Sequence, residues 1–281
     1  MKKIAVLTMA RNDEWFLNRW VAYYGKIFGE GNLFVYLDGT DQQKPSGAGR
    51  ANVTAVPKQG IEVVKAEKMR LDFLSDRAAE LLERYDIVIG VDSDEFLVVD
   101  PRAGTSLAEY LSKKTIGSSL SALGIDFAEH LGLDSKFDMS RPLLGQRRFA
   151  LIHSRFTKPN IITRPLRWGR GFHRIKGKNF RIDENLYLFH FGNYNYDAVI
   201  AKMNHPDIVA RKEVKHYKRN RLRIFNVVSN AKILRGRAAD RAFRLARFIQ
   251  TVFRPPFAWN KPSMLGLKWV VEIPERFRGI V

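Results

Sequence analysis

The chain has 281 residues, 45% of them hydrophobic, which is enough for one substantial core or two modest ones. It contains no cysteine, so disulfide frameworks, thiolate zinc sites and cysteine nucleophiles are excluded. Much of the formal net charge of +19 lies near the C-terminal end, where residues 202–281 carry 19 Lys and Arg against 5 Asp and Glu. That segment is expected to meet an anionic partner.

The first hundred residues alternate between apolar runs typical of strands and apolar residues at helical spacing. In chain order, the pattern predicts a strand at 4–8, a helix at 14–28, a strand at 33–37, a loop at 42–52, a short strand at 61–64, a helix at 71–85 and a strand at 86–91. This alternation favours an α/β fold with an open, mostly parallel sheet flanked by helices.

Further strands are expected between residues 118 and 197, most clearly at 121–125 and 186–191. Beyond His205-Pro206 the composition shifts to basic helix. We therefore expect a main α/β domain over residues 1–204 and a basic, largely helical C-terminal extension over residues 205–281.

Three predicted strand ends carry acidic residues: Asp13-Glu14, Asp38 with Asp41, and Asp92 with Asp94. Open parallel sheets bind ligands beyond the carboxyl ends of their strands. Mn²⁺ and Mg²⁺ prefer carboxylate oxygens, so Asp92 and Asp94 are the predicted metal ligands, with Asp92 also within reach of a ribose or a metal-bound water. The alternative is a solvated turn, because Asp-x-Asp occurs often by chance.

Other residues near this edge are candidates for nucleotide binding. Asp38 is expected to contact the base or ribose, unless its Asp-Gly pair simply forms a turn. Arg11 and Asp41 belong to the same predicted binding edge. Arg77 is a candidate for neutralising phosphate, with a solvent-facing arginine as the alternative.

His190 stands in an aromatic, strand-like run and is a candidate third metal ligand, or else a buried, hydrogen-bonded histidine. If the nucleotide carries a sugar, transfer of that sugar to an acceptor with inversion of the anomeric carbon requires a base to take the acceptor proton. Asp126 and Glu129 follow a predicted strand and are the candidate bases, although Asp126 could instead cap a helix.

These motifs resemble the family 2-like glycosyltransferases with a GT-A fold. That family begins with a strand, an Asn-Glu pair and a helix of the form Leu-x-x-Trp-x-x-Tyr-His, to which residues 11–24 are similar. Its Asp-Asn-x-Ser-x-Asp tip resembles residues 38–41, and its Asp-x-Asp-Glu-Phe-Leu motif is similar to residues 92–97. The resemblance is good over residues 1–100 and loose over 101–200. Asp13 in place of glutamate, Tyr24 in place of histidine and the shorter tip at Asp38 depart from the family pattern.

The resemblance implies a metal-dependent hexosyl or related transferase that uses Mn²⁺ or Mg²⁺ and a nucleotide-sugar donor, with a UDP-sugar expected. Asp92 and Asp94 would bind the metal and diphosphate, Asp38 the nucleoside, and His190 would be the late histidine that some members contribute to the metal. The acceptor would be a glycan or glycolipid of cell-surface polysaccharide or lipopolysaccharide synthesis.

The basic extension allows two interpretations. Its amphipathic helices could lie on an anionic membrane surface, which predicts a cytoplasmic protein on the inner face of a membrane. Alternatively, their apolar faces dock on the catalytic domain and the charges are solvated.

Two other functions fit the sequence less well. A nucleotidyltransferase is disfavoured because residues 8–12, after the first strand, contain no glycine. A nucleic-acid-binding protein is disfavoured because it leaves the three acidic strand ends unexplained.

Overall fold

The computed structural model describes residues 1–58, 63–175, 177, 180–204, 214–254 and 261–281, without the side chains of 63–64 and 214–221. The helices are α1 (Glu14–Phe28), α2 (Val63–Leu81), α3 (Leu107–Lys113), α4 (Tyr196–Met203), α6 (Val214–Asn230) and α7 (Arg237–Val252). The strands are β1 (Ile4–Ala10), β2 (Leu33–Asp38), β3 (Asn52–Val56), β4 (Ile87–Gly90), β5 (Glu95–Val99), β6 (Ser119–Ala128), β7 (Phe149–Ile152), β8 (Ile161–Ile162), β9 (Ile182–Asn193), β10 (Ile233–Leu234) and β11 (Val270–Glu272).

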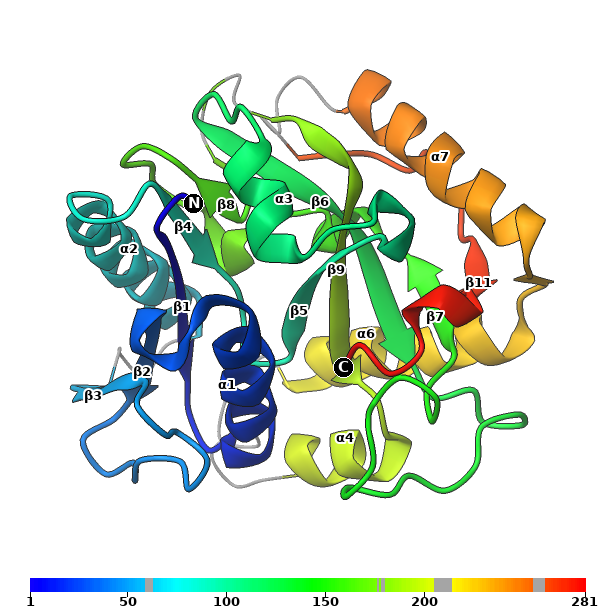
Figure 1. Ribbon diagram of the computed structural model, residues 1–281. Helices are drawn as coiled ribbons and strands as arrows, with labels where there is room; N and C mark the ends of the chain where they lie inside the picture. The colour runs from blue at the N-terminus through cyan, green and yellow to red at the C-terminus, as the bar shows by residue number, and fades with distance from the viewer. Residues whose placement is uncertain (59–62, 176, 178–179, 205–213, 255–260) are drawn as a thin grey trace.

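The described strands form one sheet in the order β10-β11-β7-β6-β8-β4-β1-β2-β3, with β5 joined through β9 to β6 (Figure 1). The N-terminal strands β3, β2, β1 and β4 pair in parallel. The short β8 pairs in antiparallel fashion with both β4 and β6, and β9 pairs in parallel with β6. The predicted α/β class, an open sheet flanked by helices, is confirmed.

Helices cover both faces of β1, which is why this strand lacks any polar alternation. Ile4 and Val6 belong to the core cluster of helix α1, with Trp20 and Val21. The alternate side chains of β1, such as Ala5 and Leu7, point to the opposite face of the sheet, where they share a cluster with α2 residues such as Leu71. Each such fully buried apolar side chain contributes about 1.5–3 kcal/mol, so the position of β1 is fixed from both sides.

One local prediction near the edge strand of the sheet was wrong, and that edge strand itself was not predicted. Val63-Val64 begin helix α2 rather than forming a strand, and residues 61–62 lie outside the described part. The edge strand is instead β3 (Asn52–Val56), which pairs in parallel with β2. Most of β3 is at least partly exposed, so hydrophobic periodicity gave little sign of it.

The C-terminal segment is attached to the sheet by both strand pairing and helix packing. β11 pairs in antiparallel fashion with β7, with Val271 opposite Ala150. The inner face of α7 is buried, and its Phe243 ring lies 5.2 Å from that of Tyr187 on β9. The inner face of α7 therefore docks on the sheet, as one of the two interpretations of the basic extension predicted. Within the part of the chain that the structure describes, no helix is long and apolar enough to span a bilayer.

Candidate active site

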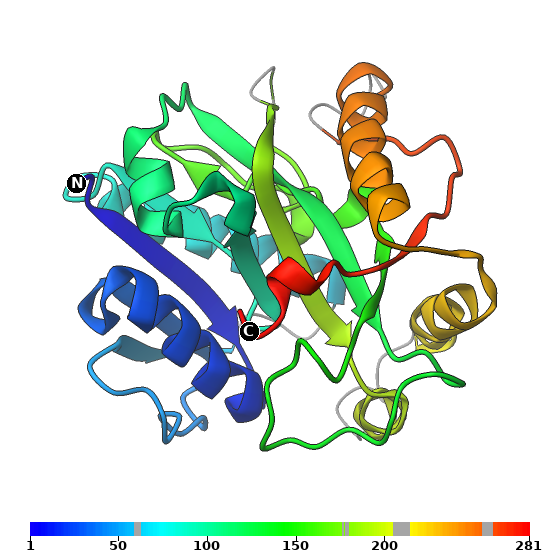
Figure 2. The same ribbon diagram turned by 45° about the vertical axis from the view of Figure 1, so that its right-hand side comes forward.

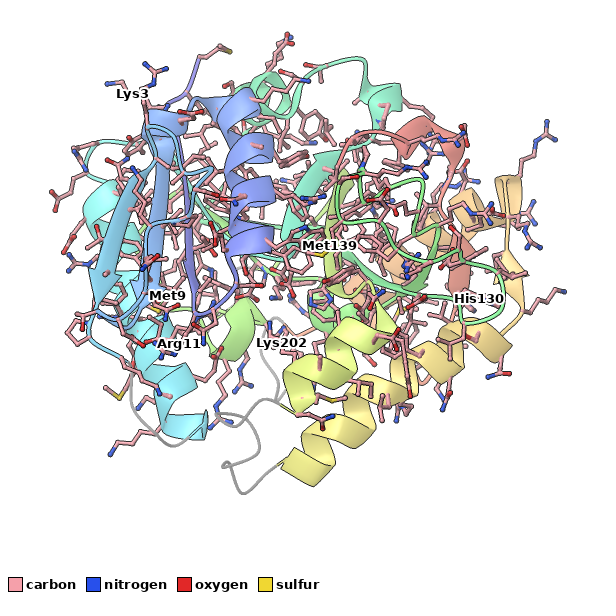
Figure 3. All side chains as sticks on the ribbon, turned by 90° about the horizontal axis from the view of Figure 1, so that it is seen from below. Lys3, Met9, Arg11, His130, Met139 and Lys202 are labelled. Atoms are coloured by element: carbon pink, nitrogen blue, oxygen red, sulfur yellow. The ribbon has the colours of Figure 1, made fainter. Side chains whose placement is uncertain are left out.

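The acidic residues lie where the parallel strands end, at the carboxyl end of the sheet, which we call the binding edge. β1 pairs in parallel with β2 on one side and with β4 on the other, so the three strands finish on the same side. Figure 3 views the molecule from below, at this end, where Met9 and Arg11 mark the end of β1. The Ser93 hydroxyl, after β4, donates to Asp13 after β1 over 2.6 Å. This contact links the ends of two neighbouring strands.

Arg11 fixes the tip that follows β2. Its guanidinium donates to both carboxylate oxygens of Asp41, over 2.8 and 2.7 Å, and to the backbone oxygen of Asp38 over 2.7 Å. Hydrogen bonding from Arg11 lowers the pKa of Asp41 to about 2. The first two loops of the binding edge are therefore held together by a bidentate ion pair.

Asp92 is held by two cations. Arg70 of α2 donates to Oδ1 over 2.5 Å, and the Lys158 ammonium donates to Oδ2 over 2.8 Å. Burial favours the neutral acid, but Lys158 and Arg70 outweigh it and hold the pKa of Asp92 well below its usual range. Both carboxylate oxygens of Asp92 thus face a cationic side chain of the protein.

Lys158 is itself almost fully buried, with 1% of its side chain exposed, and it lies 2.5 Å from the fully buried carboxylate of Glu95. Burial lowers the pKa of this lysine, but the charges of Asp92 and Glu95 outweigh it, so the pKa lies above its usual value. Burial, as the largest influence, raises the pKa of Glu95 to about 7 despite the nearby ammonium. Lys158 is therefore the charged centre of a buried network.

A second chain of contacts runs through Asp94, His190, Asp126 and His153. His190 Nε2 lies 3.4 Å from Asp94 Oδ2, and its Nδ1 lies 2.6 Å from Asp126 Oδ1. His153 Nδ1 lies 3.3 Å from the other Asp126 oxygen. Sheet register explains this meeting, because His190 on β9 stands directly opposite Asp126 on β6.

The opposite charges of these contacting side chains stabilise one another. Burial lowers the pKa of His190, but the carboxylates of Asp94 and Asp126 outweigh it and raise the pKa to about 10. Burial conversely raises the pKa of Asp126, yet His190 and His153 hold it well below its usual range. His190 consequently carries both ring protons, with Nδ1–H donating to an ionised Asp126 and Nε2–H facing Asp94. A divalent ion bound at Nε2 would displace the proton from that nitrogen.

Asp94 and His190 fit a divalent cation. Their facing oxygen and nitrogen atoms are 3.4 Å apart, less than twice a metal–ligand distance of about 2.1 Å, so one ion can contact both. Metal-binding histidines commonly donate their other ring N–H to a carboxylate, as His190 does to Asp126. Asp92 fits less well as a direct ligand, because Arg70 and Lys158 contact its two oxygens.

Nowhere among the described residues do three or more His, Asp or Glu side chains gather closely enough to hold a metal ion by themselves. Mg²⁺ typically keeps several waters and takes one or two protein ligands together with substrate phosphates. The three-ligand set of Asp92, Asp94 and His190 stays a prediction: Asp94 and His190 face each other over 3.4 Å, while Asp92 contacts Arg70 and Lys158.

Gly124 on β6 places the loop that carries the two missed site residues His153 and Lys158. The His153 N–H donates to the Gly124 oxygen, and the Gly124 N–H donates to Thr157 Oγ1 over 2.9 Å. A Cβ at Gly124 would lie 2.3 Å from the backbone of Phe156, so only glycine permits this approach. The loop thereby stacks the Phe156 ring on the His190 imidazole, with centroids 3.8 Å apart.

Two predicted residues lie in other environments. Glu129 pairs with the fully buried Arg147 over 3.2 Å and accepts the Tyr196 N–H that begins α4, so its carboxylate anchors that helix. Arg77 pairs with Glu80 over 2.5 Å on α2. Arg70, two turns nearer the binding edge on the same helix, is the arginine that reaches Asp92.

Sequence reasoning missed Arg70, His153 and Lys158. Arg70 stands one residue before the predicted start of its helix, and Lys158 is one of 48 Lys and Arg residues. The one available signal for Lys158 was its position three residues before the apolar pair Ile161-Ile162. That signal was weak because a lysine flanking a short strand is usually solvated.

No protein-family model and no curated protein matches the chain. Among solved structures, a mycobacterial protein is 20% identical over 44% of this chain and 41% of its own, with a TM-score of 0.29. A Desulfovibrio desulfuricans protein proposed to be a nucleotide-diphospho-sugar transferase is 14% identical over 45% of this chain and 59% of its own, with a TM-score of 0.26.

The bifunctional glycosyltransferase WbbM in its apo form is 17% identical over 44% of this chain and 23% of its own, with a TM-score of 0.25. The chain therefore spans less than two thirds of the length of each of these structures. In each comparison the likeness covers less than half of this chain.

Proposed function

We propose that the chain is a metal-dependent glycosyltransferase that takes a sugar from a nucleotide-diphosphate donor, with a UDP-sugar expected, and passes it to a glycan or glycolipid acceptor. The observation that carries this proposal is the Asp94–His190 pair, oriented by Asp126 at the edge where the parallel strands end. A glycolipid or cell-surface polysaccharide precursor is the acceptor class that the proposal favours.

The diphosphate would lie beside Asp94 and His190. A divalent ion held by these two residues would neutralise the charge that develops on the leaving diphosphate. Lys158 and Arg70 place two further positive charges next to Asp92. These charges would offset the repulsion between the carboxylates near the metal and the diphosphate. Arg11 and the Asp38 tip lie at the same edge and would flank the nucleoside.

The acceptor would approach from the His153 side. His153 is 36% exposed, whereas Asp126 behind it is 3% exposed, so the imidazole and not the carboxylate meets solvent. Asp126 orients that ring through Nδ1 and leaves Nε2 as the atom able to take an acceptor proton. In this proposal Asp126 acts through His153, and Glu129 supports α4.

Nucleoside diphosphates should stabilise the protein only together with a divalent ion. With UDP at about one hundred times its dissociation constant and Mn²⁺ present, we expect the melting temperature to rise by about 5 °C. Excess EDTA should remove this rise in melting temperature, and Mn²⁺ without nucleotide should raise the melting temperature much less. A thermal-shift panel of UDP and GDP tests this, and an equal rise in EDTA would contradict the metal site.

Asp126→Asn should weaken binding of Mn²⁺ alone by about 10- to 100-fold, because a neutral amide no longer polarises the His190 ring. Titration calorimetry with MnCl₂ measures this without a turnover assay. Asp100→Asn is the matched control, since Asp100 is equally buried but pairs with Arg276 and Arg102. It should lower stability and leave Mn²⁺ affinity unchanged, and the same loss in both variants would refute the orienting role.

A further inference from the structure

Helix α7 has a docked face and an outward face. Its inner residues belong to the core cluster beneath it, and its one acidic residue, Asp240, is held on that side by Arg276 over 2.6 Å. The Arg247 side chain also points toward the sheet, where it donates to the backbone oxygen of Asp183 and lies over the Tyr187 ring. Figure 2 shows α7 at the periphery, with the segment that leads to β11 running beside it.

The outward face of α7 exposes an apolar stripe. Leu245, Phe248 and Val252 follow one another at helical spacing, and they are 44%, 60% and 53% exposed. Phe253, directly after the helix, is 47% exposed. Large apolar side chains are common singly on surfaces, but a contiguous stripe of them indicates a binding surface.

Exposed cations border this stripe. Arg241 and Arg244 are exposed on the same side of α7, and neither pairs with a carboxylate of the described residues. The sequence from residue 241 to residue 271 contains six Lys and Arg and no Asp or Glu. An apolar stripe beside arginines is the arrangement of a helix that lies in a charged interface.

A neighbouring turn adds two more exposed apolar side chains. Leu265 is 60% exposed and Leu267 is 39% exposed, on either side of Gly266. The contact of Gln250 with the Met264 sulfur, at 3.1 Å, holds this turn against the C-terminal half of α7. Exposed apolar side chains are therefore also present on a turn that contacts the same helix.

We propose that the outward face of α7 is a docking surface for an anionic lipid bilayer, into which Leu245, Phe248 and Val252 insert while Arg241 and Arg244 contact lipid phosphates. The apolar side chains of the stripe have no partner on a nucleic-acid backbone, whereas acyl chains bury them, so the surface fits a membrane better than DNA or RNA. The proposal does not depend on the transferase activity.

Vesicle partitioning of the full-length protein tests the proposal. We expect binding to phosphatidylcholine vesicles that contain about a third phosphatidylglycerol, little binding to phosphatidylcholine alone, and weaker binding in high salt. Leu245→Gln with Phe248→Gln should lower the partition coefficient at least about tenfold by removing apolar burial. Arg241→Gln with Arg244→Gln should lower it on the order of tenfold or more by removing two charges.

Matched controls change the same residue types elsewhere. Leu131 and Leu133 are about as exposed as the α7 stripe, and Leu131→Gln with Leu133→Gln should leave partitioning within about twofold. Arg50→Gln with Arg84→Gln gives the corresponding charge control, with the same expectation.

Four results would overturn the proposal. The first three are no vesicle binding by the full-length protein, equal losses in control and α7 variants, and binding to a DNA duplex without binding to vesicles. A dimer that dissociates in the Leu245/Phe248 variant, again without vesicle binding, would also overturn it, by showing that a second copy covers the stripe.

Discussion

Lys158→Met should lower the free energy of unfolding by about 3–5 kcal/mol, the usual cost of removing one partner from a buried ion pair. The ammonium lies 2.8 Å from Asp92 and 2.5 Å from Glu95, with 1% of its side chain exposed. Methionine keeps most of the volume, so the loss reports charge rather than a cavity. Without Lys158, Glu95 is left without its cation in a fully buried position.

Urea unfolding followed by circular dichroism measures this loss. The control is Lys113→Met, because Lys113 pairs with Glu109 on the exposed surface of α3 and should change stability by less than about 0.5 kcal/mol. Adding Glu95→Gln to Lys158→Met should restore much of the loss, since it removes the carboxylate that lost its partner. Arg70 still holds Asp92 in that double variant. A loss below about 1 kcal/mol in Lys158→Met would show that the network is not needed for the fold.

Much of the fold was predictable where one physical signal dominated. Helix α1 has the predicted bounds, Glu14–Phe28, because its apolar residues recur at helical spacing between a polar break and a glycine. Strand β4 was predictable because it is buried on both faces and continuously apolar. β3 was missed because an edge strand that is largely exposed has no such signal.

The site was predictable only in part, because it is assembled from separate strands. That acidic residues after β1, β2 and β4 share an edge follows from parallel order alone. The meeting of Asp126, His190 and His153 depends on the register of β6, β9 and the loop after β7, which sequence periodicity does not encode. The pairing of Asp92 with Lys158 depends on the close approach at Gly124, which no local pattern reveals.

Tyr24 has a structural role in the fold. Its hydroxyl accepts a hydrogen bond from the Leu97 backbone N–H over 2.7 Å and donates one to the backbone oxygen of Glu95 over 3.1 Å, which ties α1 to β5. Burial, as the largest influence, raises its pKa well above the usual value, so the hydroxyl stays neutral. Tyr24 thus acts as a structural clamp between α1 and β5.

Asp94→Asn should lower the rate of nucleoside diphosphate release from a nucleotide sugar by about 10²- to 10³-fold, equivalent to several kcal/mol of lost charge stabilisation. The amide keeps the size of the carboxylate, and Asp94 is 18% exposed, so the melting temperature should change little. Asp92→Asn should behave differently, because it breaks contacts to Arg70 and Lys158 and so lowers stability together with activity. Asp76→Asn, on α2 in an exposed pair with Arg167, serves as the control that keeps most of the activity. The diagnostic result is a stable Asp94→Asn protein without turnover, since a fold defect would lower both quantities and an unchanged rate would remove Asp94 from the mechanism.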